Sequence, residues 1–513
     1  MKLKELLTGV EIVEVLDADE ELEIKGITAD SREVSEGFAF IARRGLTVDG
    51  HLFIEDALKR GAVCVVYEKP TPLETRVARI RVKDSASSLA RIASNFYDNP
   101  SEKLRLIGIT GTNGKTTTTL LIGSILAEAG FKPIIIGTLG IGRLNEDSES
   151  RFSFSERGLT SPEPTKLQRT LGEAVKAGAT HAVMEASSHA IAQKRLEFCN
   201  FKVKLFTNIS QDHLDFHETM DNYIRTKKSF FEREEFGKSD YIVSLSDDEV
   251  GREILKEARV TAVSFGFGEE ACVRGKVTRL DERETEVEIS YTPARVSMVD
   301  YSMPSKPIKS KVSSVLIGKH NALNILAGFS VGLAEEIEVE KIAKGIERVR
   351  KVPGRLERVE NNRGIHIFVD YAHTPDAISK VLSSLRELAP SSRIICVFGC
   401  GGDRDKLKRP LMAQAVASVA DAVIITTDNP RSEDPMKIAE EILAGITQAH
   451  FEHKPKYMVE LDRRNAIKIA ISDAKPGDIV LVAGKGHEDY QIFRDRTIHF
   501  SDVEAIEEIL REI

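Results

Sequence analysis

Hydrophobic and polar residues follow patterns that change along the chain and mark separate folding units. Residues 1 to 98 mix short apolar runs, Phe38 to Ile41 and Ala62 to Val66, with helical stretches, and they end in the turn-forming Tyr97-Asp-Asn-Pro-Ser101. From Leu104 onward, apolar strands are followed by glycine-rich turns and amphipathic helices, the alternation that builds a mostly parallel sheet. A small α/β domain followed by a parallel-sheet domain is therefore predicted.

Two later changes of pattern complete the prediction. Between about residues 258 and 316 polar and apolar residues alternate, as from Thr285 to Tyr291, which predicts half-exposed antiparallel strands appended to the middle domain. After Lys351-Val-Pro-Gly-Arg355, strands and helices alternate again. We predict an α/β chain with three domains: residues 1–98, a central parallel-sheet domain over 99–349, and a doubly wound, Rossmann-like domain over 350–513.

Composition and charge narrow the class of protein. The 513 residues are 41% hydrophobic and 30% charged, a globular balance, and the net charge of −8 gives no global reason to bind nucleic acid or an anionic membrane. The N-terminus lacks an apolar signal core, and no apolar run approaches the roughly 18 residues of a membrane span. We expect a cytoplasmic protein and a monomer.

Cysteine usage argues against a disulfide framework and against a zinc site. The five cysteines include no CxxC pair. Cys396 and Cys400 are four residues apart, but the first falls in a strand-like run and the second in a glycine turn. Any metal site is therefore expected to use other ligands.

The strongest chemical signal is a predicted phosphate loop. Leu104 to Thr117 forms a strand, a glycine turn and the start of a helix, the context in which backbone N–H groups surround phosphates. In this segment Lys115 would reach the outer phosphates and the Thr116 hydroxyl would hold Mg²⁺. The loop itself is formed by Gly111, Thr112, Asn113, Gly114, Lys115, Thr116 and Thr117.

Two further strands are expected to deliver polar side chains to the same sheet edge. Glu185 ends the strand His181 to Glu185, where ligands collect in open parallel sheets, so it is a candidate Mg²⁺ ligand. His213 follows the strand Val203 to Thr207. Considered alone, a histidine at a strand end is more often a structural hydrogen-bonding group than a metal ligand.

Six motifs together resemble the Mur ligase family, the cytosolic ATP-dependent enzymes that build the peptide of the bacterial cell-wall precursor. The motifs occur in the family's order and cover all three domains. They are Gly111-Thr-Asn-Gly-Lys-Thr-Thr117, Glu185-Ala-Ser-Ser-His189, Thr207-Asn-x-x-x-Asp-His213, Gly318-Lys-His-Asn-x-x-Asn324, Pro353-Gly-Arg355 and Asp370-Tyr-Ala-His373.

Further motifs resemble the branch of the family that adds the third residue to UDP-N-acetylmuramoyl-L-alanyl-D-glutamate. They are Asp212-His-Leu-Asp215, Gly399-Cys-Gly-Gly-Asp-Arg-Asp405, Asp428-Asn-Pro-Arg431 and Gly484-Lys-Gly-His-Glu488. The resemblance implies meso-diaminopimelate as the added amino acid, and hence a role in peptidoglycan synthesis, cell shape and cell division. L-Lysine in its place, or a related folylpolyglutamate synthetase, are the alternatives. A nucleotide-dependent switch that only hydrolyses ATP is a third.

The resemblance also implies a role for individual residues along the UDP-linked substrate. The N-terminal domain would bind its uridine end, and the middle domain its muramoyl-dipeptide part; the family's usual Asn before the Thr160-Ser161 pair is Leu159 here. Hydroxyl and amide groups suit a sugar-peptide, and an arginine suits its anionic groups. The implied residues are Ala29, Ser31, Leu46, Thr47, Val48, Thr160, Ser161, Ser187, Gln193 and Arg195.

By the same resemblance, the nucleotide and the amino acid would meet the third domain. Asn321 and Asn324 would lie on the adenine side, with Arg355 and Asp370 meeting ATP. The amino-acid pocket would consist of Arg404, Asp428, Asn429, Pro430, Arg431, Gly484 and Glu488. Arg431 would hold the distal carboxylate of diaminopimelate, and Glu488 the distal ammonium.

The family also carries a lysine modified by CO₂, which corresponds to Lys227 here, next to Lys228. An unmodified lysine is positively charged at neutral pH and would repel Mg²⁺, whereas a carbamate supplies oxygen ligands. The resemblance thus implies two Mg²⁺ ions held by Thr116, Glu185, His213 and modified Lys227, with the carbamate directed at the second ion. Lys115, Glu185, His213 and Lys227 would be the catalytic residues.

Overall fold

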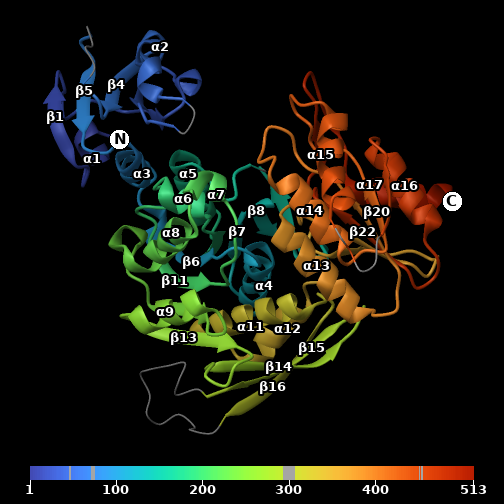
Figure 1. Cartoon of the computed structure of the whole chain (residues 1–513). Helices are drawn as coiled ribbons and strands as arrows, with labels where there is room; N and C mark the ends of the chain where they lie inside the picture. Colours follow the sequence, from blue (N-terminus) through green and yellow to red (C-terminus); the bar gives the residue numbers. More distant parts are fainter. Residues whose placement is uncertain (46–47, 71–74, 157, 293–306, 450, 452–454) are drawn as a thin grey trace.

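The computed structural model describes residues 1–45, 48–70, 75–156, 158–292, 307–449, 451 and 455–513. Within these residues the chain forms three main sheets, each with its own helices (Figure 1). The predicted α/β class and the three-part organisation are confirmed.

The N-terminal unit is a five-stranded sheet of order β1-β5-β4-β3-β2, parallel except at β1. Leu6, Ile80 and Ile92 lie at its core. Its elements are α1 (Leu3–Leu6), β1 (Ile12–Leu16), β2 (Gly26–Thr28), η1 (Ser31–Glu33), β3 (Phe38–Ile41), η2 (Gly50–Phe53), α2 (Ile54–Lys59), β4 (Ala62–Tyr67), β5 (Ala78–Val82) and α3 (Ser85–Phe96).

The middle unit is an eleven-stranded sheet of order β16-β15-β14-β13-β12-β11-β6-β10-β7-β8-β9. The strands from β14 to β7 are parallel, and antiparallel hairpins extend the sheet at both ends. The strands are β6 (Arg105–Thr110), β7 (Pro133–Gly137), β8 (Gly140–Leu144), β9 (Phe152–Ser155), β10 (His181–Glu185), β11 (Phe201–Phe206), β12 (Tyr241–Leu245), β13 (Thr261–Gly266), β14 (Val273–Leu280), β15 (Thr285–Tyr291) and β16 (Ile308–Ser314).

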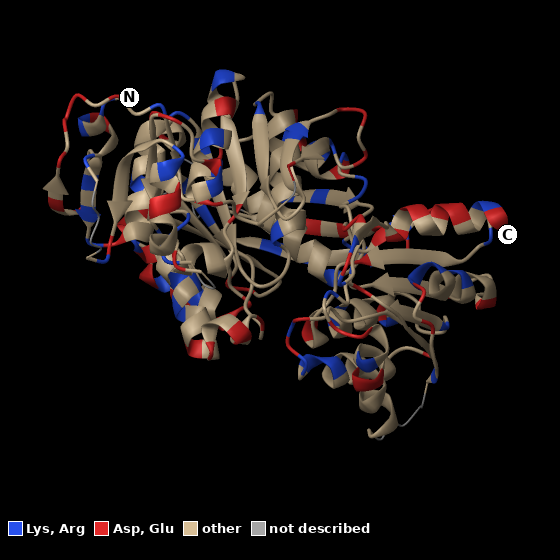
Figure 2. Ribbon diagram, turned by 90° about the horizontal axis from the view of Figure 1, so that it is seen from above, with Lys and Arg blue, Asp and Glu red and all other residues tan. Residues whose placement is uncertain are grey.

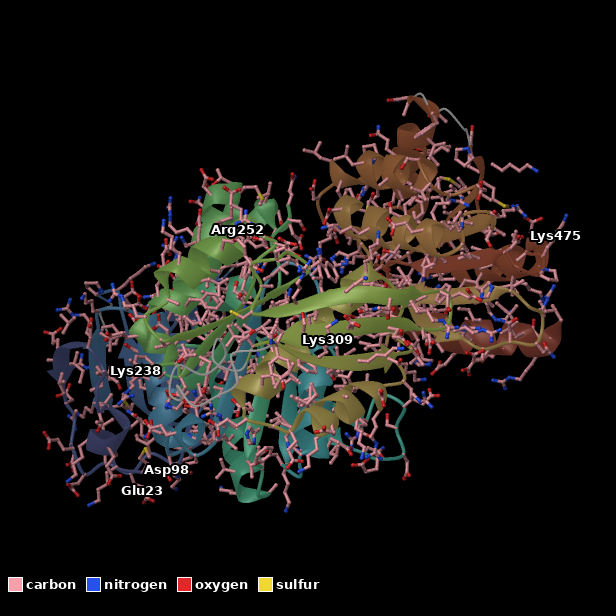
Figure 3. All side chains as sticks on the ribbon, turned by 90° about the horizontal axis from the view of Figure 1, so that it is seen from below. Glu23, Asp98, Lys238, Arg252, Lys309 and Lys475 are labelled. Carbon is pink, nitrogen blue, oxygen red and sulfur yellow. The ribbon has the colours of Figure 1, made fainter. Side chains whose placement is uncertain are left out.

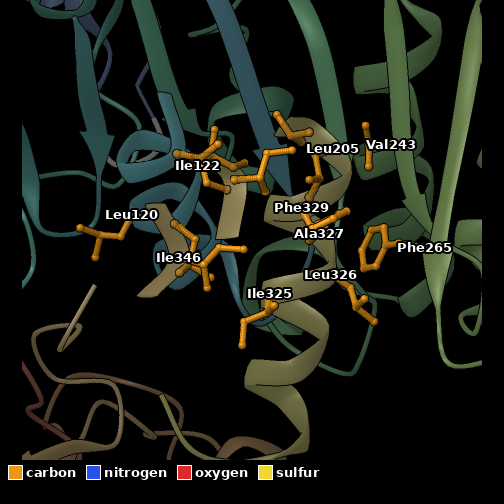
Figure 4. Packing of buried hydrophobic residues seen from close by; sticks show 14 of the residues in the cluster. Leu120, Ile122, Leu205, Val243, Phe265, Ile325, Leu326, Ala327, Phe329 and Ile346 are labelled. Atoms are coloured by element: carbon orange, nitrogen blue, oxygen red, sulfur yellow. The ribbon is translucent and has the colours of Figure 1, made fainter. Parts of the chain in front are cut away.

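The helices of the middle unit cover this sheet and enclose its main core. Helix α4 is buried along nearly its whole length, as expected of a helix that is apolar or small-sided all round. Figure 4 shows Leu120 and Ile122 of α4 with residues of α11, α12 and the sheet around them. The helical elements are η3 (Pro100–Glu102), α4 (Lys115–Glu128), α5 (Pro164–Lys176), α6 (Ser188–Ala192), α7 (Leu214–His217), α8 (Met220–Glu232), η4 (Glu234–Phe236), α9 (Glu249–Glu257), α11 (Lys319–Ala334) and α12 (Val339–Glu347).

The C-terminal unit is a six-stranded sheet of order β17-β18-β22-β19-β20-β21, parallel except at β17. A two-stranded ribbon, β23 with β24, is added to it. Its elements are β17 (Glu357–Val359), β18 (His366–Asp370), α13 (Pro375–Leu388), β19 (Ile394–Phe398), α14 (Lys408–Ala417), β20 (Ala422–Ile425), α15 (Pro435–Thr447), β21 (Lys456–Val459), α16 (Arg463–Asp473), β22 (Ile479–Ala483), β23 (Tyr490–Ile492), β24 (Thr497–His499) and α17 (Asp502–Glu512).

Charged residues lie on the outside of the molecule (Figure 2), and the residues that line the candidate site lie where the second and third units meet. Figure 2 shows acidic and basic residues interleaved over the ribbon, and Figure 3 shows charged side chains such as Glu23, Asp98 and Lys475 at the outer edge. Among the described residues, no helix is long and apolar enough to cross a membrane.

Candidate functional site

The turn after β6 has the geometry of a phosphate-binding loop. Gly111 and Gly114 have φ angles of 142° and 85°, conformations that favour glycine. A Cβ at Gly111 would lie 1.9 Å from the Thr207 hydroxyl oxygen, and one at Gly114 would lie 2.3 Å from Asn324 Oδ1. Only glycine therefore allows the loop to close against its neighbours and open onto the N-terminus of α4, where backbone N–H groups favour anions.

Lys115, the first residue of α4, folds back over this loop. Its ammonium donates hydrogen bonds to the carbonyl oxygens of Gly111, at 2.9 Å, and of Thr112, at 2.8 Å. Burial lowers the pKa of Lys115, while Glu185 and Asp212 oppose that shift. The side chain is thus held across the loop whose N–H groups would receive phosphates.

Glu185, at the end of β10, meets α4 at the neighbouring strand end. The Thr116 hydroxyl donates to Glu185 Oε1 at 3.0 Å, and the Thr138 N–H and hydroxyl donate to the two carboxylate oxygens at 2.9 and 3.0 Å. Glu185 is 1% exposed. A hydroxyl and a carboxylate, both oxygen ligands, therefore lie side by side at the mouth of the phosphate loop.

Lys227, on α8, reaches the other side of the same loop. Its side chain is 1% exposed, its Nζ donates to the Gly111 carbonyl oxygen at 2.7 Å, and it lies 4.7 Å from the centre of the Tyr223 ring. Burial, with a further contribution from Lys115, holds the pKa of Lys227 well below its usual range. Burial thus shifts this amine toward its neutral form, which is the form that reacts with CO₂.

His213 precedes α7 in a left-handed conformation, with a φ of 54°. Its Nε2 lies 3.4 Å from Asp212 Oδ2, and its ring contacts that of His189 at 4.7 Å. Burial lowers the pKa of His213 to about 4. The imidazole is therefore neutral at physiological pH, as a metal-binding histidine must be.

A cavity of about 330 Å³ brings these groups together with residues of the third unit. It is lined by all four residues predicted to bind magnesium, namely Thr116, Glu185, His213 and Lys227. Among the described residues, no group of three or more His, Cys, Asp or Glu side chains could hold a metal ion by itself. The donor set fits a magnesium ion that also takes oxygens from threonine, from phosphate and from a modified lysine.

The same cavity receives Arg355 and Asp370 from the third unit and Asn321 and Asn324 from α11. Asp370 accepts the N–H groups of Leu356 and Ala372, both at 2.7 Å, so it fixes the turn that carries Arg355. The Arg355 guanidinium stacks on the Tyr371 ring at 4.6 Å, and its Nη2 lies 3.5 Å from the Thr116 hydroxyl. Residues of two units thus face each other across the phosphate loop.

The residues expected to bind the muramoyl-dipeptide part form a hydroxyl cluster beside Glu185. Ser161 Oγ donates to the Glu185 carbonyl oxygen at 2.8 Å and accepts the Ser187 N–H at 3.0 Å, and the Thr160 and Thr138 hydroxyls are 3.2 Å apart. The Ser187 hydroxyl caps α6. The hydroxyls serve as structural hydrogen-bonding groups in this conformation and line the cavity at Thr160 and Ser187.

An ion-pair network continues from this cluster to the N-terminal unit. The Arg195 guanidinium hydrogen-bonds Gln193 Oε1 at 2.7 Å and lies 3.2 Å from Glu163. Glu163 also accepts a hydrogen bond at 2.7 Å from Arg43 of the first unit. Sequence reasoning missed Arg43 and Glu163, because nothing in their local pattern distinguishes them from surface charges.

The predicted uridine-binding residues lie close to Arg43 in the sequence. Ala29 follows β2, Ser31 begins η1 behind the capping side chain of Asp30, and Val48 is 52% exposed. Leu46 and Thr47 lie outside the described residues. The uridine role of the described three stays a prediction.

The predicted amino-acid pocket is assembled from loops at the carboxyl ends of β19, β20 and β22. Asn429 Nδ2 donates to Glu488 Oε2 at 2.9 Å, and Arg431 Nη1 donates to the Gly402 carbonyl oxygen at 2.7 Å. A Cβ on Gly401 would lie 2.9 Å from Arg431 Nη1 and 3.7 Å from Arg404 Cγ, so both arginines approach one glycine. Pro430 and Gly484, with a φ of 108°, complete the turns.

Sequence reasoning missed three further groups of the site. Lys485 is wholly buried beside Glu488, Tyr371 stacks on Arg355, and His320 lines the nucleotide cavity. Burial and the charge of Glu488 raise the pKa of Tyr371 to about 12. Lys485 and Tyr371 lie inside motifs quoted above, but a lysine between two glycines gives no sign that it is buried.

Three family descriptions match the chain in order. Mur ligase family, catalytic domain, matches residues 23–97; Mur ligase middle domain matches residues 109–332; and Mur ligase, glutamate ligase domain, matches residues 354–486. The chain belongs to the Mur ligase family. The second match contains the phosphate loop, and the third contains the predicted amino-acid pocket except for Glu488, which follows two residues after the match ends.

Curated Mur ligase relatives cover the chain from end to end. A UDP-N-acetylmuramoyl-L-alanyl-D-glutamate--2,6-diaminopimelate ligase from Clostridium tetani is 38% identical over all of both chains. One from Aquifex aeolicus is 41% identical over 95% of this chain and 94% of its own. A solved structure of a ligase of that name is 28% identical, with a TM-score of 0.67 over 100% and 99% of the two chains. MurF from Thermotoga maritima in complex with ADP shares the fold, at 21% identity and a TM-score of 0.61 over 96% and 99%.

Proposed function

We propose that this chain is the ATP-dependent ligase that joins meso-diaminopimelate to UDP-N-acetylmuramoyl-L-alanyl-D-glutamate in the cytoplasm, a step of peptidoglycan precursor synthesis. The observation that carries the proposal is full-length identity of 37–41% to curated ligases of that name. The site supports it, because a phosphate loop and a separate amino-acid pocket lie in neighbouring units.

The first chemical step is transfer of a phosphoryl group to a carboxylate. An oxygen of the D-glutamate side-chain carboxylate attacks the γ-phosphorus of ATP, the bond from that phosphorus to the bridging oxygen breaks, and ADP leaves. Lys115 and Arg355, which flank the loop from two units, would neutralise the charge that spreads over the transferring group. The product is an acyl phosphate.

The second step forms the amide bond. The amine of diaminopimelate attacks the acyl carbon, the carbon–oxygen bond to phosphate breaks, and the amine loses a proton to solvent or a base. Water would hydrolyse the acyl phosphate, so the third unit must shield the cavity while the amine approaches. Tyr371 and Arg355, stacked at 4.6 Å, lie on the third-unit side of that cavity.

Magnesium would be held by Thr116, Glu185, His213 and a carbamate of Lys227, and when bound it supplies charge neutralisation for the phosphates. The burial of Lys227 supports the modification, because a cation enclosed at this position by Lys115 and a metal would be costly, whereas a carbamate presents two oxygens. Lys228 points elsewhere and pairs with Glu253 and Glu257.

The choice of amino acid would rest on opposite charges at the two ends of the pocket. Arg431 would hold the distal carboxylate of diaminopimelate through its guanidinium fork, and Glu488 would receive the distal ammonium. L-Lysine lacks that carboxylate and would leave Arg431 unpaired. Arg404, which approaches the same glycine as Arg431, adds positive charge at the carboxylate end.

The test is an amide-ligation assay of the UDP-dipeptide with ATP, Mg²⁺ and a panel of amino acids. We expect ADP and a UDP-tripeptide in equal amounts with meso-diaminopimelate, and much less product with L-lysine or L-glutamate. ADP release without the UDP-dipeptide would indicate a nucleotide-dependent switch. Product from a folate and glutamate would indicate a folylpolyglutamate synthetase.

A further inference from the structure

We propose that Lys485 is a positioning residue of the amino-acid pocket: its buried ammonium holds Asp428 and Glu488 together as a two-carboxylate receptor for the ammonium end of the diamino acid. The inference rests on the proposed function, because it concerns how the same pocket selects its substrate. It adds a residue that the substrate itself does not need to touch.

Lys485 lies at the centre of a buried charge cluster. Its side chain is 0% exposed, and its Nζ lies 2.5 Å from the Tyr490 carbonyl oxygen, 3.3 Å from Glu488 Oε2 and 3.7 Å from Asp428 Oδ1. One ammonium thus faces two carboxylates and one carbonyl. Burying a charge is costly unless it is paired, so this lysine and these carboxylates depend on each other.

Glu488 is oriented from two sides at the same oxygen. Lys485 and the Asn429 amide both donate to Oε2, and Asn429 Oδ1 in turn accepts the Ile492 N–H at 3.0 Å. The carboxylate therefore cannot rotate freely. A fixed carboxylate loses less conformational entropy on binding an ammonium than a mobile one does.

Asp428 supplies an acceptor that is not yet used. Its Oδ1 is buried and makes no hydrogen bond within the described residues, although Lys485 Nζ is 3.7 Å away. A buried polar atom without a partner is unfavourable, and an incoming N–H donor would satisfy it. These two carboxylates and the lysine carry a net charge of −1. Arg463, a buried cation that also interacts with both carboxylates, is paired with Asp502, so one negative charge is left for a substrate ammonium.

Removing the lysine charge would disturb this receptor in a specific way. Asp428 and Glu488 would then repel each other, because no cation would lie between them. The pocket would lose its geometry. Binding of the diamino acid would weaken, while binding of ATP and of the UDP-dipeptide would not.

Lys204 provides a matched control. It is also buried, at 2% exposure; its Nζ donates to the Gly237 carbonyl oxygen at 3.2 Å and lies 5.4 Å from the centre of the Phe230 ring, in the middle unit. Among the described residues no carboxylate is found to pair with it, and burial alone lowers the pKa of this lysine to about 8. Lys204→Met therefore removes a buried ammonium without removing a receptor.

The experiment measures steady-state kinetics of Lys485→Met, Lys485→Arg, Lys204→Met and the wild type between pH 6 and 9. We expect Lys485→Met to raise the KM for meso-diaminopimelate at least about tenfold, with the KM for ATP and for the UDP-dipeptide within about twofold. Lys485→Arg should recover part of the loss, and Lys204→Met should leave all three KM values unchanged.

The outcomes separate this inference from the proposed function. If the wild type ligates diaminopimelate but Lys485→Met keeps its KM for diaminopimelate, or loses affinity for all three substrates equally, the positioning role is wrong and the function stands. If the wild type does not use diaminopimelate, both are wrong. Should Lys485→Met fail to fold, Lys485→Gln gives the same comparison with a neutral side chain that can still hydrogen-bond.

Discussion

The phosphate site of the middle unit and the amino-acid pocket of the third unit are built in different ways. The first uses three neighbouring parallel strands, β10, β6 and β11, whose carboxyl ends carry Glu185, the glycine loop and the segment leading to His213. Strands that are adjacent in one parallel sheet bring their ends together automatically. The site therefore follows from the order of the strands.

The amino-acid pocket depends on contacts between loops that no strand order dictates. The Gly402 N–H donates to the Asn429 carbonyl oxygen, and the Arg431 N–H donates to the Ile492 carbonyl oxygen. The Asn429 side-chain amide donates to the Glu488 carboxylate. Each contact joins segments about 30 to 60 residues apart in sequence. A site made of strand ends should thus lose chemistry when one side chain changes, whereas a pocket made of loops should lose selectivity.

The largest expected effect is at the phosphate site. Lys115→Ala should lower kcat more than about a thousandfold, because the ammonium acts on charge that develops on the transferring phosphoryl group. Its thermal unfolding midpoint should stay near that of the wild type. The measurement is ADP release under saturating substrates, with Lys176→Ala, an exposed lysine on α5, as the control. Near-normal turnover of Lys115→Ala would remove this residue from the chemistry.

The difference between the two sites also explains how much the sequence could predict. The strands that carry Glu185 and the glycine loop could be read from apolar runs ending in polar residues, and the alternation from Thr285 to Tyr291 gave β15, whose side chains alternate between buried and partly buried. The local sequence pattern determines these strands, so they could be predicted without knowledge of distant contacts.

The rest could not be predicted, because it depends on distant partners. Lys485 is buried only because Asp428, Glu488 and the turn at Tyr490 surround it, and Arg43 becomes relevant only because Glu163 of another unit accepts its hydrogen bond. Neither feature leaves a trace in hydrophobic periodicity. Roles in the amino-acid pocket came from family resemblance rather than from pattern.

The next prediction concerns Lys227, whose carbamate is proposed to supply an oxygen ligand at the strand-end site. Lys227→Ala should lower kcat by about a hundredfold or more, since an oxygen ligand of the metal would be lost. Acetate or formate at millimolar concentration should restore part of the activity by replacing the missing oxygens. Intact-mass analysis of the wild type, prepared with bicarbonate and handled at neutral to alkaline pH, checks the carbamate directly.

The matched control is the adjacent Lys228→Ala. That side chain pairs with Glu253 and Glu257 on α9, and its loss should change kcat less than about twofold. Equal losses in the two variants, or acetate stimulation of Lys228→Ala, would assign the effect to the helix rather than to the buried amine.

Arg431 tests the loop-built pocket. Arg431→Ala should lower kcat/KM for meso-diaminopimelate by about 30-fold or more, as expected for the loss of one partner of a desolvated charge pair. Use of L-lysine should fall much less, so selectivity should collapse while ADP formation remains possible. Arg494→Ala, an exposed arginine that donates to the Ser432 carbonyl oxygen in the neighbouring turn, is the control. A wild-type preference for lysine would contradict the assignment.

The last expected effect is on stability rather than on activity, and it depends on how tightly the middle site is packed. His217 is 6% exposed, its ring contacts those of Phe216 and Tyr223, and burial lowers its pKa to about 4. Since its ordinary pKa is 6.5, the unfolded chain binds this proton between pH 6.5 and 4 while the folded chain does not. Its contribution to stability is therefore present above pH 6.5 and lost as pH falls toward 4.

His217→Phe keeps the ring and removes the titration, so the free energy of unfolding of the wild type relative to this variant should fall by up to about 3 kcal/mol over that range. Urea unfolding at pH 7.5, 6, 5 and 4.5 measures the difference. His499, on the exposed β24, gives the opposite sign, because Glu504 raises its pKa and its contribution is lost as pH rises. A wild-type and His217→Phe pair with the same pH dependence would show that this ring has the same pKa in the folded and the unfolded chain, and that the cluster around Tyr223 admits water.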